Sequence, residues 1–225
     1  MANKNGKLYV SAKDETVRMF KSDFLEFFTH VHPATPLVLF IPVIAYFYYT
    51  AFVTQHMTLS TVGLWTVVGL IVWTFTEYFM HRFVFHFTPI GPLSEKIIFI
   101  FHGVHHDYPQ DSKRLVMPPL VSIALSTAFY FLFKELFGAQ VIAPLYGSFL
   151  IGYLCYDMTH YTVHHIQFKS KWFKMVKTNH LRHHYRWPER LYGVSSPLWD
   201  YILGSMPKAT ADDQKIVQEV LDKEQ

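Results

Sequence analysis

Histidine is the residue type whose number and spacing suggest chemistry in this chain. Of the 14 histidines, 11 fall into four short clusters. The clusters are His81 and His86; His102, His105 and His106; His160, His164 and His165; and His180, His183 and His184. Neutral imidazole binds zinc, iron, copper and nickel, and one ion takes about four to six ligands. So many imidazoles therefore predict two metal ions. The other three histidines, His30, His32 and His56, are expected not to bind metal.

The spacing within the clusters is typical of helices. Side chains three or four residues apart lie on one face of a helix, so all three imidazoles of the second cluster, and all three of the fourth, can point the same way. His165 is turned by about 100° from His164, which predicts a place beside the metal site and not in it. His81 and His86 are five residues apart, so both reach one site only if the helix ends or distorts between them.

Long apolar helices must position these clusters. Charged residues make up only 16% of the chain, against roughly 25% in soluble domains, and none lies between Glu26 and Glu77. A membrane crossing takes about 20 apolar residues. This stretch therefore predicts two crossings, at 35–54 and 59–76. A second pair is expected at 117–133 and 139–156, so that the four crossings form two hairpins.

The positive charges predict the orientation. With four crossings, 19 of the 20 Lys and Arg residues lie on one side of the membrane, and the positive-inside rule makes that side cytoplasmic. Every histidine cluster lies at or directly after a cytoplasmic end of a crossing. We therefore expect an all-α membrane protein of four transmembrane helices, arranged as two hairpins and capped on the cytoplasmic face by His-rich helices. Both termini are cytoplasmic in this arrangement.

The remaining composition limits the other function classes. We expect a lead-in at 1–34, too polar for a signal peptide, one membrane domain at 35–207 and a tail at 208–225. Cys155 is the only cysteine, which excludes an intrachain disulfide and a four-cysteine zinc site. The net charge of +3 favours a membrane surface, and no nucleic-acid-binding motif is present.

Two carboxylates lie close to the clusters in sequence. Glu77 precedes His81 by four residues, and Asp157 precedes His160 by three. Carboxylates around a metal site commonly hold the second nitrogen of a ligand imidazole. We therefore predict that Glu77 and Asp157, together with His165, surround and orient the ligands. The alternative is that both carboxylates are ordinary charges at a membrane boundary.

The residues that flank the histidines carry a family resemblance. The segments are Glu77-Tyr-Phe-Met-His81-Arg-Phe, His102-Gly-Val-His-His-Asp-Tyr-Pro, Tyr153-Leu-Cys-Tyr-Asp157-Met-Thr-His160-Tyr and Tyr192-Gly-Val-Ser-Ser-Pro-Leu-Trp-Asp200. With the histidine spacing, they resemble the membrane fatty acid hydroxylase/sterol desaturase superfamily of di-iron oxygenases. Within it they are similar to the fatty acid 2-hydroxylase branch. The resemblance extends over most of the chain.

The resemblance implies both a ligand set and a reaction. The implied ligands are His81, His86, His102, His105, His106, His160, His164, His180, His183 and His184. They would hold two iron ions, and zinc could occupy the same imidazoles. The implied reaction uses O2 as co-substrate and places a hydroxyl group on carbon 2 of a long-chain fatty acyl group, in a ceramide or its acyl precursor.

The resemblance also implies partners. Relatives often carry a fused cytochrome b5 domain, whereas only about 35 residues precede the first crossing here. We therefore expect a separate electron donor, either cytochrome b5-like or ferredoxin-like, and a bacterial inner membrane in preference to the endoplasmic reticulum. The aromatic residues Trp187 and Tyr192, which follow the last cluster, are predicted to contact the acyl substrate. So are the aromatic residues around the first cluster, for which the alternative is contact with lipid.

Two other functions remain open. The first is another lipid oxidation on the same scaffold, such as desaturation or hydroxylation of a sterol or carotenoid, which product analysis would distinguish. The second is a non-catalytic membrane protein that binds or transports metal. Transport would require polar groups at mid-membrane depth, and the predicted crossings have almost none.

Overall fold

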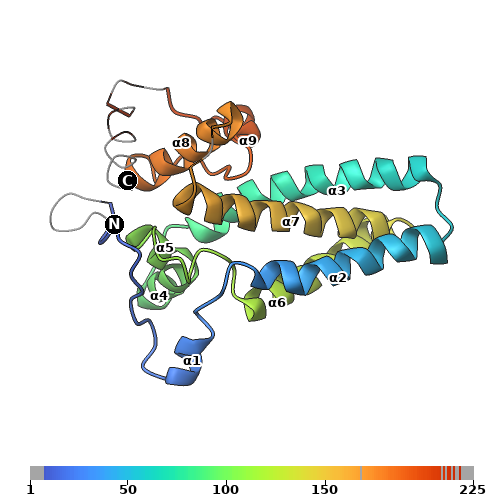
Figure 1. The fold of residues 1–225 in the computed structure, drawn as a ribbon, viewed down its shortest axis with the longest axis horizontal. Coiled ribbons are helices and arrows are strands. Elements are labelled where there is room, and N and C mark those ends of the chain that lie inside the picture. The colour runs from blue at the N-terminus through green and yellow to red at the C-terminus, as the bar shows by residue number, and fades with distance from the viewer. Residues whose placement is uncertain are drawn as a thin grey trace.

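The computed structural model describes residues 8–208 apart from residue 168, and beyond them residues 210, 212, 213, 215 and 218. The predicted lead-in and tail therefore lie partly outside the described residues. Within the described chain all regular structure is helical and no strand occurs, which confirms the all-α class. The long helices run side by side, and the short helices gather at one end of them (Figure 1).

Three helices are long and apolar enough to cross a membrane. Helix α2 (Thr35–Tyr49) continues as the π-helix η1 (Thr50–Thr54), and α3 (Leu59–Phe79) continues as the π-helix η2 (Met80–Phe85). The third is α6 (Pro119–Phe137). The first coincides with the predicted crossing at 35–54, and the other two overlap the crossings predicted at 59–76 and 117–133. The first helix ends where its predicted crossing ends, at Thr54, whereas the second and third continue past the predicted ends at 76 and 133.

The helix ends have local causes. The Thr58 hydroxyl accepts a hydrogen bond from the Thr61 N–H at 3.3 Å and so caps α3. Proline at the start of α6 costs no hydrogen bond, because the first N–H groups of a helix have no partner inside it. Gly138, with φ of 86°, ends α6. The turn between α6 and the next long helix therefore lies at 138–141. The predicted crossings at 117–133 and 139–156 placed this turn at 134–138, but Lys134 and Glu135 are still helical.

Helix α7 (Ile142–His165) contains the fourth predicted crossing. It packs against α2, α3 and α6, and most of it is buried. Small residues allow the close approach: a Cβ on Gly69 of α3 would lie 2.2 Å from the Leu145 carbonyl oxygen, and one on Gly152 would lie 2.4 Å from the Trp73 ring. Helix α7 is more polar than the other three long helices and is not among the three spanning candidates. The count of four crossings therefore stays a prediction.

The short elements form a cap at one end of the bundle (Figure 1). They are α1 (Asp23–Phe27), α4 (Pro92–Ile98), η3 (Phe99–Gly103), α5 (Val104–Asp107), α8 (Lys171–Tyr185) and α9 (Leu198–Ile202). The cap carries the second and fourth histidine clusters, as predicted. That this end faces the cytoplasm stays a prediction.

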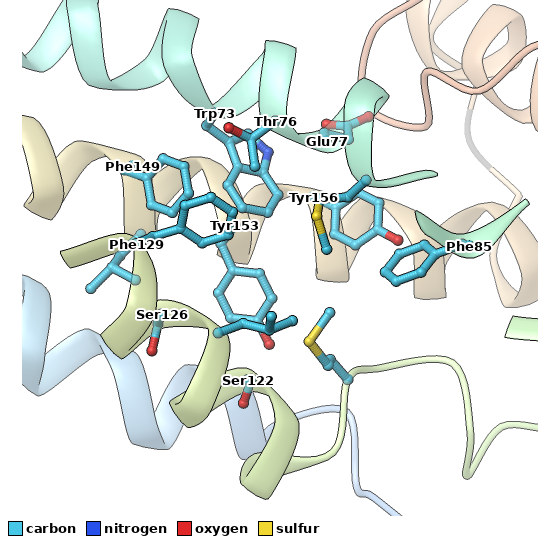
Figure 2. A pocket seen from close by; sticks show the side chains of 14 residues that line it. Trp73, Thr76, Glu77, Phe85, Ser122, Ser126, Phe129, Phe149, Tyr153 and Tyr156 are labelled. Atoms are coloured by element: carbon cyan, nitrogen blue, oxygen red, sulfur yellow. The ribbon is translucent and has the colours of Figure 1, made fainter. Parts of the chain in front are cut away.

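An apolar pocket lies inside the bundle, between α3, α6 and α7 (Figure 2). Trp73, Phe129, Phe149 and Tyr153 are among the side chains that line it. A second pocket of about 130 Å³ shares Phe85, Met117 and Tyr156 with the first and extends to His102, His105 and His160. The two pockets adjoin at these shared residues and extend from the interior of the bundle toward the histidines, and we refer to them together as the apolar path.

Candidate metal centre

Ten histidines form two groups at the junction of the bundle and the cap. Among the described residues, the ligand nitrogens within each group all lie within 4.8 Å of one another. Site A consists of His81, His86, His102, His106 and His183, and site B of His105, His160, His164, His180 and His184. These are the ten residues that the sequence predicted as ligands. His30, His32, His56 and His165 lie outside both sites.

Two of the clusters divide between the sites. In the second cluster His102 of η3 and His106 of α5 belong to site A and His105 to site B, whereas in α8 His183 belongs to site A and His180 and His184 to site B. Although the spacing allows all three imidazoles of a cluster to point the same way, each of these clusters therefore supplies both sites. Three imidazoles at spacings of three and four fan out over a wide enough arc to serve two adjacent ions. The rings of His106 and His184, from different sites, are stacked 4.3 Å apart.

A distorted helix brings His81 and His86 together. The α-helix α3 passes into the π-helix η2 at Met80, and His86 follows with φ of −112°. A π-turn holds one more residue than an α-turn, so residues five apart are brought to the same face. The ring centres of His81 and His86 are 5.0 Å apart. The predicted distortion is confirmed.

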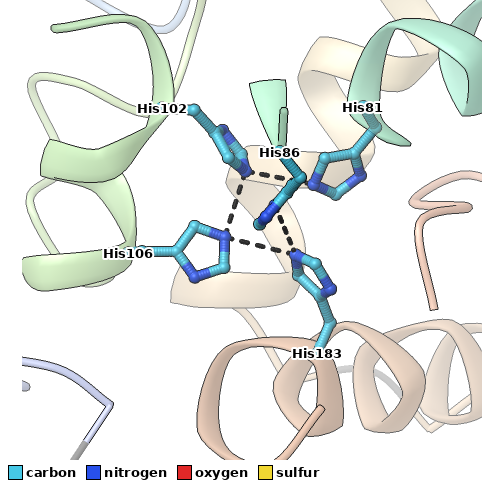
Figure 3. A group of neighbouring side chains, drawn as sticks. All are labelled: His81, His86, His102, His106 and His183. Atoms are coloured by element: carbon cyan, nitrogen blue, oxygen red, sulfur yellow. Dashed lines mark hydrogen bonds between the residues drawn. The ribbon is translucent and has the colours of Figure 1, made fainter. Parts of the chain in front are cut away.

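The Nε2 atoms of site A surround a common point (Figure 3). The Nε2 atom of His102 lies 3.0 Å from that of His81 and 3.1 Å from that of His106. The Nε2 atom of His183 lies 3.1 Å from that of His86 and 3.2 Å from that of His106. Two nitrogens bound at right angles to one ion, at about 2.1 Å each, are about 3.0 Å apart. The spacing therefore fits five nitrogen ligands around one ion.

Site B has the same spacing. The Nε2 atoms of His105 and His160 are 2.9 Å apart, and the Nε2 atom of His180 lies 2.9 Å from that of His164 and 3.0 Å from that of His184. All five side chains are buried. Five nitrogens leave one position of an octahedron for another ligand in each site. An all-imidazole donor set suits iron and zinc alike.

Backbone carbonyls fix the other nitrogen of three imidazoles. The Nδ1–Hs of His81, His183 and His160 donate to the carbonyls of Tyr192 at 2.6 Å, Arg190 at 2.6 Å and Leu115 at 3.2 Å, respectively. Because a carbonyl only accepts, Nδ1 must carry the proton, and the Nε2 lone pair is left for the metal. Sequence reasoning missed these partners, since every residue type carries a carbonyl.

Burial keeps the imidazoles neutral. It lowers the pKa of His183 to about 4, although the Arg190 carbonyl opposes the shift. Burial, followed by the neighbouring His160, also holds the pKa of His105 well below its usual range. Metal binding requires the unprotonated imidazole. Both sites therefore have their ligand lone pairs available at neutral pH.

Comparison with known proteins decides the family. The sequence profile described as Fatty acid hydroxylase matches residues 66–205, more than half of the chain. The chain belongs to the fatty acid hydroxylase family. The dihydroceramide fatty acyl 2-hydroxylase FAH2 of Arabidopsis thaliana is 37% identical, over 89% of this chain and 84% of the relative. The fatty acid 2-hydroxylase of Rattus norvegicus is 31% identical, over 87% of this chain and 58% of the relative.

A solved structure agrees with the fold of this hydroxylase. It is described as full-length scs7p with only the hydroxylase domain visible, and it matches with a TM-score of 0.77 and 33% identity. The match covers 83% of this chain and 70% of that one. The resemblance inferred from the motifs is therefore confirmed, and with it the all-helical architecture.

Glu77 reaches the ligands of this hydroxylase only indirectly. Its Oε1 accepts hydrogen bonds from the N–H groups of Val194 at 2.8 Å and Ser195 at 2.7 Å, and Ser195 Oγ donates to Oε2. The predicted direct contact with an imidazole does not occur among the described hydrogen bonds, because the 194–195 backbone occupies the carboxylate. Glu77 instead holds the loop whose Tyr192 carbonyl accepts from His81.

Asp157 lies beside the histidine sites, whereas His165 lies away from them. Asp157 is buried and lines the same pocket as His105 and His160, and its Oδ2 has no hydrogen-bond partner in the described chain. His165 packs its ring against Tyr161 at 4.7 Å, outside sites A and B. Asp157 therefore faces the path by which a substrate would reach the histidines, and His165 does not.

The aromatic residues divide between the path and the outer surface. Trp73 and Phe85 line the pockets as predicted, whereas Phe75, Phe79 and Phe83 are exposed on the outside of the helix. Trp187 is not in contact with the path: its Nε1 donates to Asp213 at 3.2 Å, which turns the indole toward the chain end. The Tyr192 ring packs 5.7 Å from that of His81 and so borders site A.

Proposed function

We propose that this hydroxylase adds a hydroxyl group to carbon 2 of a long-chain fatty acyl group, in a ceramide or its acyl precursor, with O2 as co-substrate. The observation that carries the proposal is that two five-imidazole sites lie at the end of an apolar path. The dihydroceramide fatty acyl 2-hydroxylase of Arabidopsis thaliana and the fatty acid 2-hydroxylase of Rattus norvegicus, to which the chain is similar, support the same reaction.

The ten histidines would hold two iron ions, and zinc fits the same nitrogens. Loaded with iron and supplied with electrons, such a centre activates O2 for hydroxylation of a C–H bond. The electrons would come from a separate protein, cytochrome b5-like or ferredoxin-like. All five imidazoles of site B are buried, which would limit the access of water there, whereas His86 and His106 of site A are only partly buried.

The apolar path would position the acyl chain. Phe129 and Phe149 line its inner part and Phe85 and Met117 the part nearer the histidines, so the tail would lie in the bundle with the carboxyl end toward the metal sites. Such fixed placement selects the carbon that reacts. Asp157, which lines the part of the path shared with His105 and His160, would contact the polar end of the substrate.

The membrane arrangement is part of the proposal. Four crossings, with α7 as the fourth, would place the 35–207 domain in the bilayer with both termini and the cap on the cytoplasmic side. The one-sided distribution of Lys and Arg supports this orientation. The relatives come from a plant, yeasts and mammals, and they give no support to the predicted bacterial inner membrane.

Product analysis tests the proposal. The full chain would be expressed together with an electron donor in a host that lacks 2-hydroxy lipids. The host cells would be grown under ¹⁸O2. Mass spectrometry is expected to find ¹⁸O-labelled 2-hydroxy acyl chains, absent with His105→Ala. A hydroxyl group on another carbon, a new double bond or an unlabelled product would overturn the proposal and favour another lipid oxidation on this scaffold.

A further inference from the structure

Helix α9 exposes apolar side chains although one of its residues is fully buried. Leu198, Tyr201 and Ile202 have exposed fractions of 49%, 66% and 59%. Asp200 in the same short helix is only 1% exposed. The helix therefore has a polar anchor on one side and an uncovered apolar face on the other, which is the pattern of an element that lies at a lipid surface.

The contacts of α9 place it at the depth of the bilayer. The Trp199 Nε1 donates to the Thr74 hydroxyl at 3.1 Å, and the Trp199 ring meets that of Phe75 at 5.1 Å. Thr74 lies two residues before the end of the crossing predicted at 59–76, and Phe75 lies one residue before it. Helix α9 therefore packs against the part of α3 that lies at the edge of the hydrocarbon core.

The apolar face of α9 continues onto the lipid-facing side of α3. Phe75, which contacts Trp199, also packs against Phe79 at 6.2 Å, and both are 44% exposed. Interfacial helices bury their apolar faces about 5–10 Å into the boundary between head groups and acyl chains. We propose that bilayer lipid is the partner that covers α9, with Tyr201 and Ile202 inserted beside α3.

The same helix holds the backbone of site A. Asp200 accepts hydrogen bonds from the N–H groups of Tyr192 at 2.9 Å and Gly193 at 2.8 Å. The Tyr192 carbonyl in turn accepts from His81. Insertion of α9 into lipid would therefore hold Asp200 in place. Asp200 in turn would hold the 192–193 backbone, and the Tyr192 carbonyl would hold the His81 ring. This link to metal binding rests on the proposed function, whereas the lipid contact of α9 does not.

A spin label tests the lipid contact. The full chain, in lipid nanodiscs and with Cys155→Ser as background, would carry a nitroxide at Ile202→Cys. The controls are Val67→Cys, exposed on α3 within the span, and Lys174→Cys, exposed on α8 in the cap. The label at 202 is expected to collide with O2 more than with a water-soluble nickel chelate, as at 67. Accessibility to nickel equal to that at 174 would overturn the proposal.

A matched pair of variants tests the link to site A. Ile202→Glu should displace α9 and lower the bound metal from two ions per chain toward one, whereas Ile202→Leu should keep both. Two ions retained with unchanged affinity in Ile202→Glu would refute the link. If the unmodified chain binds no metal, the proposed function fails, while the spin-label result still decides where α9 lies.

Discussion

At the scale of residues, the ligand histidines are held from both sides. Nε2 faces the common point of each site, and in His81 and His183 Nδ1 donates to carbonyls two residues apart in the loop that follows α8. Leu191, between those carbonyls, has φ of 61°, a left-handed conformation that is uncommon outside glycine. Strained backbone of this kind is retained where the surroundings impose it. We attribute the left-handed conformation of Leu191 to the hydrogen bonds that its two neighbours make with His81 and His183.

Adjacent histidines should differ in their importance. His164→Ala removes one nitrogen from site B, and we expect 2-hydroxy product to fall by at least about 100-fold, since loss of a mere outer partner of a metal ligand already costs about 10–100-fold. His165→Ala should cause a much smaller loss, because that ring lies outside both sites. Product quantification by mass spectrometry compares the two. Equal losses would contradict the assignment of ligands.

Glu77 should affect metal binding through the loop. Glu77→Gln keeps the size of the side chain but weakens its hydrogen bonds to the Val194 and Ser195 N–H groups, since those to a charged acceptor are stronger. We expect metal affinity at site A to fall by about 10–100-fold, with site B unchanged. Titration of the metal-free chain with ferrous iron measures both. An equal weakening of the two sites would argue for a general structural role.

The sequence identified the ten histidines that the fold brings together, but it did not identify the backbone groups that hold them. Histidines can be recognised as candidate metal ligands from residue type alone. The five-residue separation of His81 and His86 also indicated a distorted helix, which η2 provides. The carbonyls of Leu115, Arg190 and Tyr192 carry no such signal, because their position depends on the path of the backbone. The division of His105 and His106 between two sites likewise follows from the arrangement of neighbouring helices, which spacing alone does not give.

At the scale of elements, α7 is the centre around which the other long helices pack. Its contacts with α3 depend on glycine, because the backbone of one helix lies against the backbone of the other at Gly69. Three of the long helices were predicted closely from the absence of charge. The fourth was harder to identify as spanning, since a helix that is buried by its neighbours need not be as apolar as one that faces lipid.

Two glycines of α3 provide a matched test of this packing. A Cβ on Gly69 would meet the Leu145 carbonyl oxygen at 2.2 Å, whereas one on Gly63 would have no neighbour within 4 Å. We expect Gly69→Ala to destabilise the protein by about 1–3 kcal/mol, the usual cost of overpacking. Gly63→Ala should be neutral or stabilising. Thermal unfolding in detergent measures both, and a neutral Gly69→Ala would show that the helices are further apart.

The inner pocket should set the length of the acyl chain. Ser126 lines it on α6, near Phe129 and Phe149. Ser126→Phe fills the space available to the end of the tail, so the 2-hydroxy products should shift toward shorter chains, by several carbons. Ser126→Ala serves as the control and should leave the distribution unchanged. Lipidomic comparison of product chain lengths decides, and an unaltered distribution with Ser126→Phe would place the tail elsewhere.

At the scale of the whole molecule, the bundle and the cap divide the work. The bundle provides an apolar environment for a lipid tail, and the short helices of the cap gather at its end (Figure 1). Histidines from all four clusters meet at this junction in sites A and B. Site A joins η2, the continuation of α3, to the cap through His81 and His183, and site B joins α7 to the cap through His160 and His180. Two bound ions would therefore fasten the cap to the membrane helices.

The central claim is that these ten histidines hold two ions, and metal stoichiometry tests it most directly. The full chain would be loaded anaerobically with excess ferrous iron, desalted and analysed by inductively coupled plasma mass spectrometry against protein concentration. We predict two ions of iron and zinc combined per chain, and about one after His183→Ala, which removes a ligand from site A alone. A chain that retains no ion, or that saturates with a single ion, would contradict the two-metal centre.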